Sequence, residues 1–125
     1  MSMQDWNVLV VEDEPDGQVV VGGILSYFNI NVESAGTGED ALKMLASKPY
    51  NAAIIDLMLP GIDGLSLVQT IRENPRIASL PCVAITAYHT SAVKQEALEK
   101  GFDAYFSKPL DDTSFVRELS RLIEG

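Results

Sequence analysis

One short apolar stretch that stops at an acidic residue restricts the folds open to this chain more than any other feature. Residues 52–55 (AAII) are apolar, Asp56 follows directly, and prolines and glycines come soon after at Pro60, Gly61 and Gly64. This pattern predicts a buried strand that ends in a turn. In an open parallel sheet, chemistry takes place just outside the carboxyl ends of the strands. Asp56 is therefore expected at the floor of a crevice, in a position to act.

Apolar runs of this kind recur along the chain and alternate with helical patterns. The predicted strands are residues 7–11, 31–35, 52–55, 82–85 and 103–106. The predicted helices are residues 15–28, 38–47, 64–73 and 91–100, and a last helix that is capped by Asp111 or Asp112 and ends at residue 123. Strands this apolar are covered on both faces, and short connections imply parallel strands with right-handed crossovers. We therefore expect one α/β domain over residues 1–125, with a doubly wound five-stranded parallel sheet and five helices.

The balance of charge excludes several classes of partner. The chain has 9 Lys and Arg residues against 18 Asp and Glu residues, a formal net charge of −9. Direct binding to nucleic acid or insertion into a membrane is therefore not expected, and a protein or a small ligand is the expected partner. No apolar run approaches the roughly 18 residues of a membrane span, and the start MSMQDW lacks a signal-peptide pattern. The lone cysteine, Cys82, fits a reducing compartment, so we expect a cytoplasmic protein.

Polar side chains follow four of the five predicted strands. Glu12 and Asp13 follow the first strand, Asp56 the third, Thr86 the fourth and Lys108 the fifth. Parallel strands end at one rim, so these groups should converge. Carboxylates about 4 Å apart repel by roughly 4 kcal/mol per pair at an effective dielectric near 20, so the site needs a cation or a shifted proton. Oxygen ligands favour Mg²⁺, which keeps several waters and shares a phosphate oxygen with its ligands.

This combination of groups suits phosphoryl transfer to Asp56. A carboxylate beside bound Mg²⁺ can act as the nucleophile, and the catalysis needed is mostly positioning and charge neutralisation. Lys108 would hold the phosphoryl oxygens by a charge-assisted hydrogen bond, and the Thr86 hydroxyl would donate another. Ala87 is small and leaves room for the phosphoryl group.

Four segments together resemble the receiver domain of two-component response regulators. They are VVEDEP at residues 10–15, DLMLPGIDG at 56–64, ITA at 85–87 and SKP at 107–109, and the resemblance covers the whole chain. It implies a flavodoxin-like, three-layer fold with the strand order 2-1-3-4-5. One departure is Leu59, where the family usually has a methionine before the proline, and this apolar exchange has little consequence.

The resemblance implies a role for each acidic residue of the rim. Asp56 is the expected phosphoacceptor, and Glu12 and Asp13 form the acidic pair of the metal site. Mg²⁺ would be bound by Asp13, Asp56 and the backbone carbonyl of Met58.

The resemblance also implies a switch. Thr86 would be its hydroxyl and Lys108 its lysine, and Tyr105 stands where the family has its switch aromatic. Phosphorylation would change the face made by the last two helices and the fifth strand. The residues expected around this face are Lys94, Lys100, Tyr105 and Arg117.

The expected function is that of a signalling switch in a phosphorelay, not of an enzyme, although such a switch promotes its own phosphorylation and dephosphorylation. The phosphoryl donor would be a sensor histidine kinase or a histidine phosphotransfer protein. A downstream effector protein would read the phosphorylated state, and formation of a homodimer on phosphorylation remains open.

Two other functional classes remain as alternatives. A Mg²⁺-dependent small-molecule phosphatase, similar to the haloacid-dehalogenase group, also uses a strand-end aspartate, but it needs a second carboxylate where this chain has Met58. A flavodoxin-like flavin binder would need a loop rich in Ser, Thr and Gly after the first strand, where this chain has EDEP. Both classes fit the residues less well than a receiver domain does.

Several positions also have structural interpretations. Gly22 and Gly23 would weaken the first helix by roughly 1 kcal/mol each, and they indicate either a close helix contact or a surface for a partner. Met58 and Tyr88 flank the site without a carboxylate or amide that could orient a hydrolytic water, so we expect a long-lived phosphoryl group. His89, the only histidine, falls in a loop and is not expected to be a phosphodonor or metal ligand.

Overall fold

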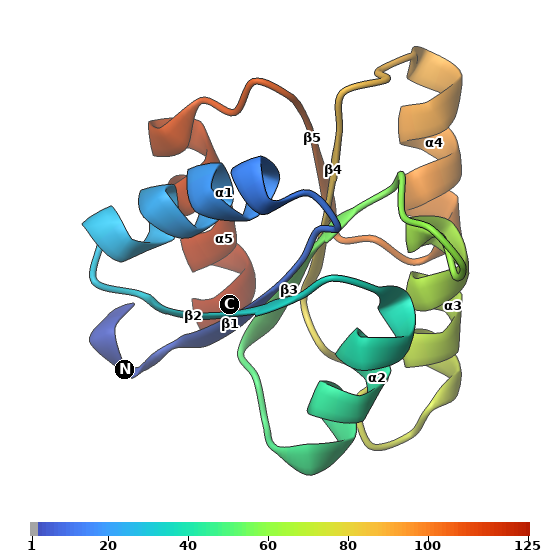
Figure 1. Cartoon of the computed structure of the whole chain (residues 1–125), viewed down its shortest axis with the longest axis horizontal. Coiled ribbons are helices and arrows are strands. Elements are labelled where there is room, and N and C mark those ends of the chain that lie inside the picture. Colours follow the sequence, from blue (N-terminus) through green and yellow to red (C-terminus); the bar gives the residue numbers. More distant parts are fainter. Residues whose placement is uncertain (1–2) are drawn as a thin grey trace.

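The computed structural model of the chain describes residues 3–125, and a parallel five-stranded sheet forms its centre (Figure 1). The strands are β1 (Asn7–Val11), β2 (Asn31–Ala35), β3 (Ala52–Asp56), β4 (Cys82–Thr86) and β5 (Ala104–Ser107). The helices are α1 (Pro15–Tyr27), α2 (Gly38–Ser47), α3 (Gly64–Glu73), α4 (Ser91–Lys100) and α5 (Asp112–Glu124), with a short 3-10 helix, η1 (Met3–Asp5), before β1. The strands are parallel in the order β2-β1-β3-β4-β5. The predicted fold and strand order are confirmed.

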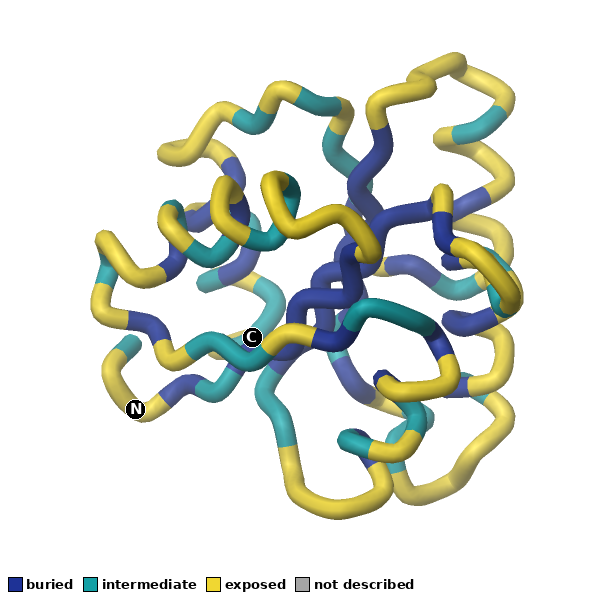
Figure 2. Tube along the Cα trace, in the orientation of Figure 1, coloured by how far each residue is buried: buried dark blue, intermediate teal, exposed yellow. Residues whose placement is uncertain are grey.

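Helices cover both faces of the sheet. α1 and α5 lie on one face, and α2, α3 and α4 lie on the other (Figure 1). Successive side chains of a strand point to opposite faces, so Val8 and Val10 pack toward α1 and α5, while Leu9 and Val11 pack toward the other three helices. Every residue of β3 and β4 is buried, and Figure 2 shows the middle of the sheet as the buried centre of the molecule.

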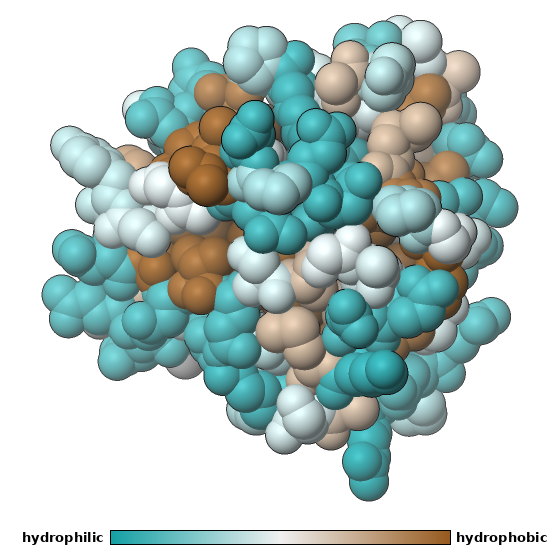
Figure 3. Space-filling view, in the orientation of Figure 1, coloured by the Kyte–Doolittle hydropathy of each residue, from teal (hydrophilic) through white to brown (hydrophobic). Residues whose placement is uncertain are grey.

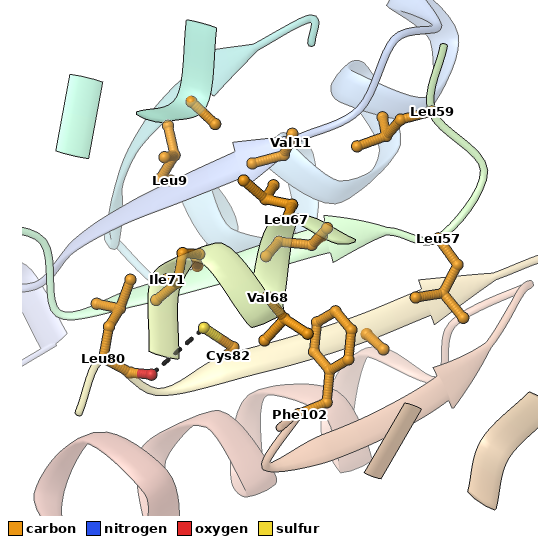
Figure 4. Close-up of a cluster of buried hydrophobic side chains, with 14 of the residues drawn as sticks. Leu9, Val11, Leu57, Leu59, Leu67, Val68, Ile71, Leu80, Cys82 and Phe102 are labelled. Atoms are coloured by element: carbon orange, nitrogen blue, oxygen red, sulfur yellow. Dashed lines mark hydrogen bonds between the residues drawn. The ribbon is translucent and has the colours of Figure 1, made fainter. Parts of the chain in front are cut away.

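The core beneath α2, α3 and α4 contains the single cysteine. Leu67, Val68 and Ile71 of α3 pack in this core together with Cys82 of β4 (Figure 4). The Cys82 thiol is fully buried and donates to the carbonyl oxygen of Leu80 over 3.3 Å. Burial raises the pKa of this thiol to about 12. The prediction that Cys82 is a buried strand residue is confirmed.

The helices and strands begin and end close to the predicted positions, and side-chain contacts explain the differences. Thr37 caps α2 as predicted, because its hydroxyl accepts a hydrogen bond from an amide of the first turn. Asp111, not Asp112, caps α5 in the same way. The fifth strand begins at Ala104, one residue later than predicted, since Asp103 instead turns its carboxylate toward the start of β4.

The Arg72 guanidinium, at the end of α3, donates hydrogen bonds to the loop before β4 and to the loop before β5. It donates to the carbonyl oxygens of Gly101, Ala78 and Leu80 at 2.9, 2.9 and 2.6 Å. Its remaining nitrogen lies 2.9 Å from the carboxylate of Asp103, which also accepts a hydrogen bond from the first amide of β4. One side chain therefore fixes where both β4 and β5 begin.

α1 leaves an uncharged face exposed. A Cβ added at Gly22 would lie 4.0 Å from its nearest neighbour, and a Cβ at Gly23 would meet no atom of the described residues within 4 Å. The prediction of a close helix contact at these glycines is therefore wrong. Val19, Val20 and Tyr27 are exposed on this helix, and Figure 3 shows an apolar patch over it. Within residues 3–125, no helix combines the length and the apolar character needed to cross a bilayer.

Candidate functional site

The predicted polar residues lie at the carboxyl ends of the strands, at one edge of the sheet. β3 ends at Asp56 itself and β4 at Thr86, one residue later than predicted in each case. Glu12 follows β1 directly, and Lys108 follows β5. Backbone hydrogen bonds continue past the strand ends, from Lys108 N to Thr86 O at 2.8 Å and from Glu12 N to Ala35 O at 3.0 Å. The loops therefore leave the sheet in fixed directions.

Asp56 is buried, and both of its carboxylate oxygens have hydrogen-bond partners. Oδ1 accepts a hydrogen bond from the backbone N–H of Met58 at 2.8 Å, and Oδ2 lies 2.7 Å from Lys108 Nζ. The turn that follows is tight, because a Cβ on Gly64 would lie only 2.7 Å from both Asp56 O and Leu57 Cα. Glycine at position 64 therefore lets the start of α3 pack directly against the backbone of the candidate phosphoacceptor.

Lys108 bridges two acidic side chains. Its ammonium lies 2.7 Å from Glu12 Oε1 and 2.7 Å from Asp56 Oδ2, and the Glu12 side chain is only 1% exposed. Burial raises the pKa of Glu12 and outweighs the hydrogen bond from Lys108, while Asp56 adds to the rise. Burial alone would lower the pKa of Lys108, but its hydrogen bonds to Asp56 and Glu12 raise it overall. The ammonium therefore stays charged and neutralises part of the acidic pocket.

A cleft of about 480 Å³ opens beside this group, and its lining includes Asp13, Met58, Thr86 and Tyr88. The Thr86 side chain is almost fully buried, and its Oγ1 accepts a hydrogen bond from the Tyr88 amide at 3.1 Å. Asp13, Met58, Ala87 and Tyr88 are all exposed. The structure thus brings the predicted hydroxyl, the predicted metal ligands Asp13 and Met58, and the flanking residue Tyr88 to one opening.

Tyr105, the predicted switch aromatic, is half-buried in β5 and contacts the loop after β4. Its hydroxyl oxygen lies 2.9 Å from His89 Nδ1, and the two ring centroids are 5.5 Å apart. Burial raises the pKa of the Tyr105 hydroxyl. Sequence reasoning did not find this contact, because nothing in the local pattern around His89 signals a partner on another strand.

The donor set of the cleft suits Mg²⁺. Among residues 3–125, no three His, Cys, Asp or Glu side chains form a ready-made metal centre. Mg²⁺ does not need one, because it keeps several waters and is usually held by one or two carboxylates. Asp13 and Asp56 can supply these carboxylates, and Met58 can add its backbone carbonyl. Glu12 and Asp56 share the single ammonium of Lys108, so this carboxylate pair keeps an excess of negative charge that favours a divalent cation.

Comparison with known protein sequences gives a consistent result. The family described as "Response regulator receiver domain" matches residues 8–120. Response regulator ArlR of Staphylococcus epidermidis is 36% identical over 117 residues, which are 94% of this chain and 52% of ArlR. Transcriptional regulatory protein GltR of Pseudomonas aeruginosa is 31% identical over 123 residues, which are 98% of this chain and 51% of GltR. The chain spans about half the length of these two relatives.

Two solved structures are similar over nearly the whole chain. One is the receiver domain of sensor histidine kinase PA1611 from Pseudomonas aeruginosa, with a magnesium ion coordinated in its active site cleft. Its TM-score is 0.88 at 28% identity, covering 96% of this chain and 98% of that chain. The other is the signal receiver domain of a signal transduction histidine kinase from Syntrophus aciditrophicus, with a TM-score of 0.88 at 25% identity over 96% of this chain and 91% of that chain.

Proposed function

The chain belongs to the response regulator receiver domain family, and we propose that it works as a phosphoacceptor switch in a two-component phosphorelay. In this proposal Asp56 accepts the phosphoryl group of a phosphohistidine on a sensor histidine kinase or a histidine phosphotransfer protein. The observation that supports it most strongly is the Asp56 carboxylate, held between a backbone N–H and the Lys108 ammonium. A nucleophile held in this way is oriented before the donor arrives.

The proposed reaction exchanges one bond to phosphorus for another. An oxygen of Asp56 attacks the phosphorus, the P–N bond to the donor histidine breaks, and the imidazole keeps the electron pair and takes up a proton. Mg²⁺ bound by Asp13, Asp56 and the Met58 carbonyl would neutralise charge on the phosphoryl oxygens. Lys108 would move its hydrogen bond from Asp56 to a phosphoryl oxygen, while Glu12 keeps the ammonium in place.

The proposed signal starts at Thr86. Its Oγ1 accepts a hydrogen bond from the Tyr88 amide, so its own hydrogen can be donated to a phosphoryl oxygen. The neighbouring Ala87 leaves space for that oxygen. Movement of Thr86 toward the phosphoryl group would shift the loop after β4, and the contact of His89 with Tyr105 would pass this shift to β5.

We propose that a protein effector reads the face made by α4, β5 and α5. The side chains proposed to carry the readout are Lys94, Lys100, Tyr105 and Arg117. The three basic residues are exposed, and Tyr105 is half-buried. Phosphorylation can act through this face only if the effector binds the two states with different affinity. A homodimer formed through the same face is the other arrangement that we propose for the phosphorylated protein.

One experiment separates the switch from the two alternative classes. After incubation with Mg²⁺ and a small phosphodonor, mass spectrometry should find one phosphoryl group added per chain. A phosphatase would instead turn over the donor many times, and a flavin binder would do neither. Met58 stands where the phosphatase group needs its second carboxylate, so the phosphatase alternative is not favoured. Continuous release of phosphate without a modified chain would contradict the proposed function.

We expect phospho-Asp56 to be long-lived, because Met58 and Tyr88 offer no group that orients a hydrolytic water. Replacing Met58 with asparagine supplies an amide beside the phosphoryl group. The release of phosphate should become roughly tenfold faster, because this factor corresponds to the free energy of one well-placed hydrogen bond. Met58→Leu is the matched control and should leave the rate unchanged. A rate for Met58→Asn equal to or below that of the unaltered protein would contradict this expectation.

We propose that the donor protein docks on the exposed face of α1. Val19 and Val20 are exposed there, and Val20 lines a hollow together with Pro109 and with Lys108, whose ammonium contacts Asp56. A donor that approaches Asp56 from the side of this hollow would cover part of α1, and an apolar helix of the donor would bury these side chains.

Replacing Val20 with aspartate tests this docking surface. A charge buried without a partner should lower phosphotransfer from a histidine phosphotransfer protein by about tenfold or more. Phosphorylation by a small phosphodonor should stay unchanged, because that donor needs no docking surface. An equal loss with both donors would mean that the substitution damages the pocket, and it would contradict docking on α1.

We further propose that residues 1–125 form one receiver domain that acts in the cytoplasm and is a signalling switch, not an enzyme. The family match over residues 8–120 supports this proposal.

A further inference from the structure

We propose that Gly17 is a positioning residue of the phosphoacceptor pocket, because its missing side chain creates the space in which Glu12 reaches Lys108. This inference rests on the proposed function of the pocket. Gly17 lies in the first turn of α1. A Cβ at this position would lie 2.1 Å from Glu12 Oε1, 2.6 Å from its Cδ and 2.8 Å from its Cγ. These separations are far below the roughly 3.5–4.0 Å at which non-bonded atoms attract one another.

The clash would fall on a side chain and not on the backbone. The three close atoms all belong to Glu12, so a methyl group at position 17 would displace its carboxylate and leave the helix where it is. The next residue supports the same interpretation, because Gln18 Nε2 donates to the Glu12 carbonyl oxygen at 2.7 Å. In the first turn of α1, Gln18 therefore holds the backbone of Glu12, and Gly17 leaves space for the Glu12 side chain.

Displacing Glu12 would change the charge around Asp56. Lys108 now divides its hydrogen bonds between the two carboxylates, at 2.7 Å from each. Without Glu12, the ammonium would pair with Asp56 alone and compete more strongly with a cation for that carboxylate. One negative charge would also move from the pocket into solvent, where it is screened. Gly17 thereby sets how available Asp56 is to Mg²⁺ and to the donor.

Gly23 provides a matched control in the same helix, because a Cβ there would meet no described atom within 4 Å. Alanine at either position favours the helix, but only at position 17 does it reach Glu12. The Lys108 side-chain signal in ¹³C NMR, recorded without Mg²⁺, reports the contact directly. We expect Gly17→Ala to move this signal toward its position in Glu12→Ala, and Gly23→Ala to leave it in place. The affinity for Mg²⁺ should fall about tenfold in Gly17→Ala, because this factor corresponds to the free energy of one charge-assisted contact.

A double variant separates positioning from a general effect on the helix. In the Glu12→Ala background, Gly17→Ala has no carboxylate to displace, so the Lys108 signal should not move further. An unmoved Lys108 signal in Gly17→Ala alone, or an equal movement in both backgrounds, would overturn the inference. Calorimetry of Mg²⁺ binding to the unaltered protein tests the proposed function independently. If that protein binds no Mg²⁺, the proposed function fails, while the Lys108 signal still decides the role of Gly17.

Discussion

Replacing Asp56 with asparagine is expected to abolish phosphorylation of the chain, lowering its rate by at least about a thousandfold, because it removes the proposed nucleophile. Asparagine has nearly the same shape and can still accept the hydrogen bond from the Met58 amide. Lys108 also keeps its contact with Glu12. The fold should therefore persist, and the loss should be confined to the chemistry. Mass spectrometry after incubation with Mg²⁺ and a small phosphodonor measures it.

An exposed carboxylate elsewhere provides the control for this experiment. Asp40 lies in the first turn of α2 and is exposed, so Asp40→Asn should be phosphorylated as the unaltered protein is. Thermal unfolding of both variants shows whether the fold is intact. Stoichiometric phosphorylation of Asp56→Asn would place the acceptor elsewhere and contradict the proposed function.

Replacing Arg72 with alanine is expected to lower the free energy of unfolding by about 3 kcal/mol, because it removes four hydrogen bonds that the guanidinium donates to three carbonyl oxygens and one carboxylate. The guanidinium is planar and forked, and it reaches Gly101, Leu80 and Asp103 at once. A lysine has one compact charge and cannot make these contacts together. Arg72→Lys should therefore recover less than half of the loss. Urea unfolding followed by circular dichroism measures both variants.

Arg76 is a matched control for the loss of an arginine. It is exposed in the loop after α3, and Arg76→Ala should change the free energy of unfolding by less than about 0.5 kcal/mol. A loss below about 1 kcal/mol in Arg72→Ala would mean that water satisfies the carbonyl oxygens, and it would contradict the bracing role of Arg72.

The fold could be predicted from the sequence because its signals are local. Each strand is a short apolar run next to a helical pattern, and this alternation leaves little choice of topology. The proximity of Asp56 and Lys108 could also be predicted, since parallel strands bring their carboxyl ends together whatever lies between them in the sequence. The hydrogen bond that Lys108 donates to Glu12 joins residues 96 apart in sequence, yet the order of the strands brings both residues to the same edge of the sheet.

The remaining features depend on distances that no local pattern encodes. Asp103 looked like the first residue of a strand, but its carboxylate pairs with Arg72 from another element. The sequence pattern pointed to the glycine pair in α1, whereas the glycine of this helix that has a close neighbour is Gly17. His89 looked like an ordinary loop residue until the structure placed it beside Tyr105. In each case the partner comes from a segment whose position is set only by the complete fold.

Lys108, which follows the last strand of the sheet, is the side chain that neutralises both Glu12 and Asp56. A chain still emerging from the ribosome acquires its acidic residues long before it acquires this lysine. Until β5 adds to the edge of the sheet, the two carboxylates face each other without their ammonium. A nascent or truncated chain that stops short of β5 therefore lacks the ammonium that balances these two carboxylates at the edge of the sheet.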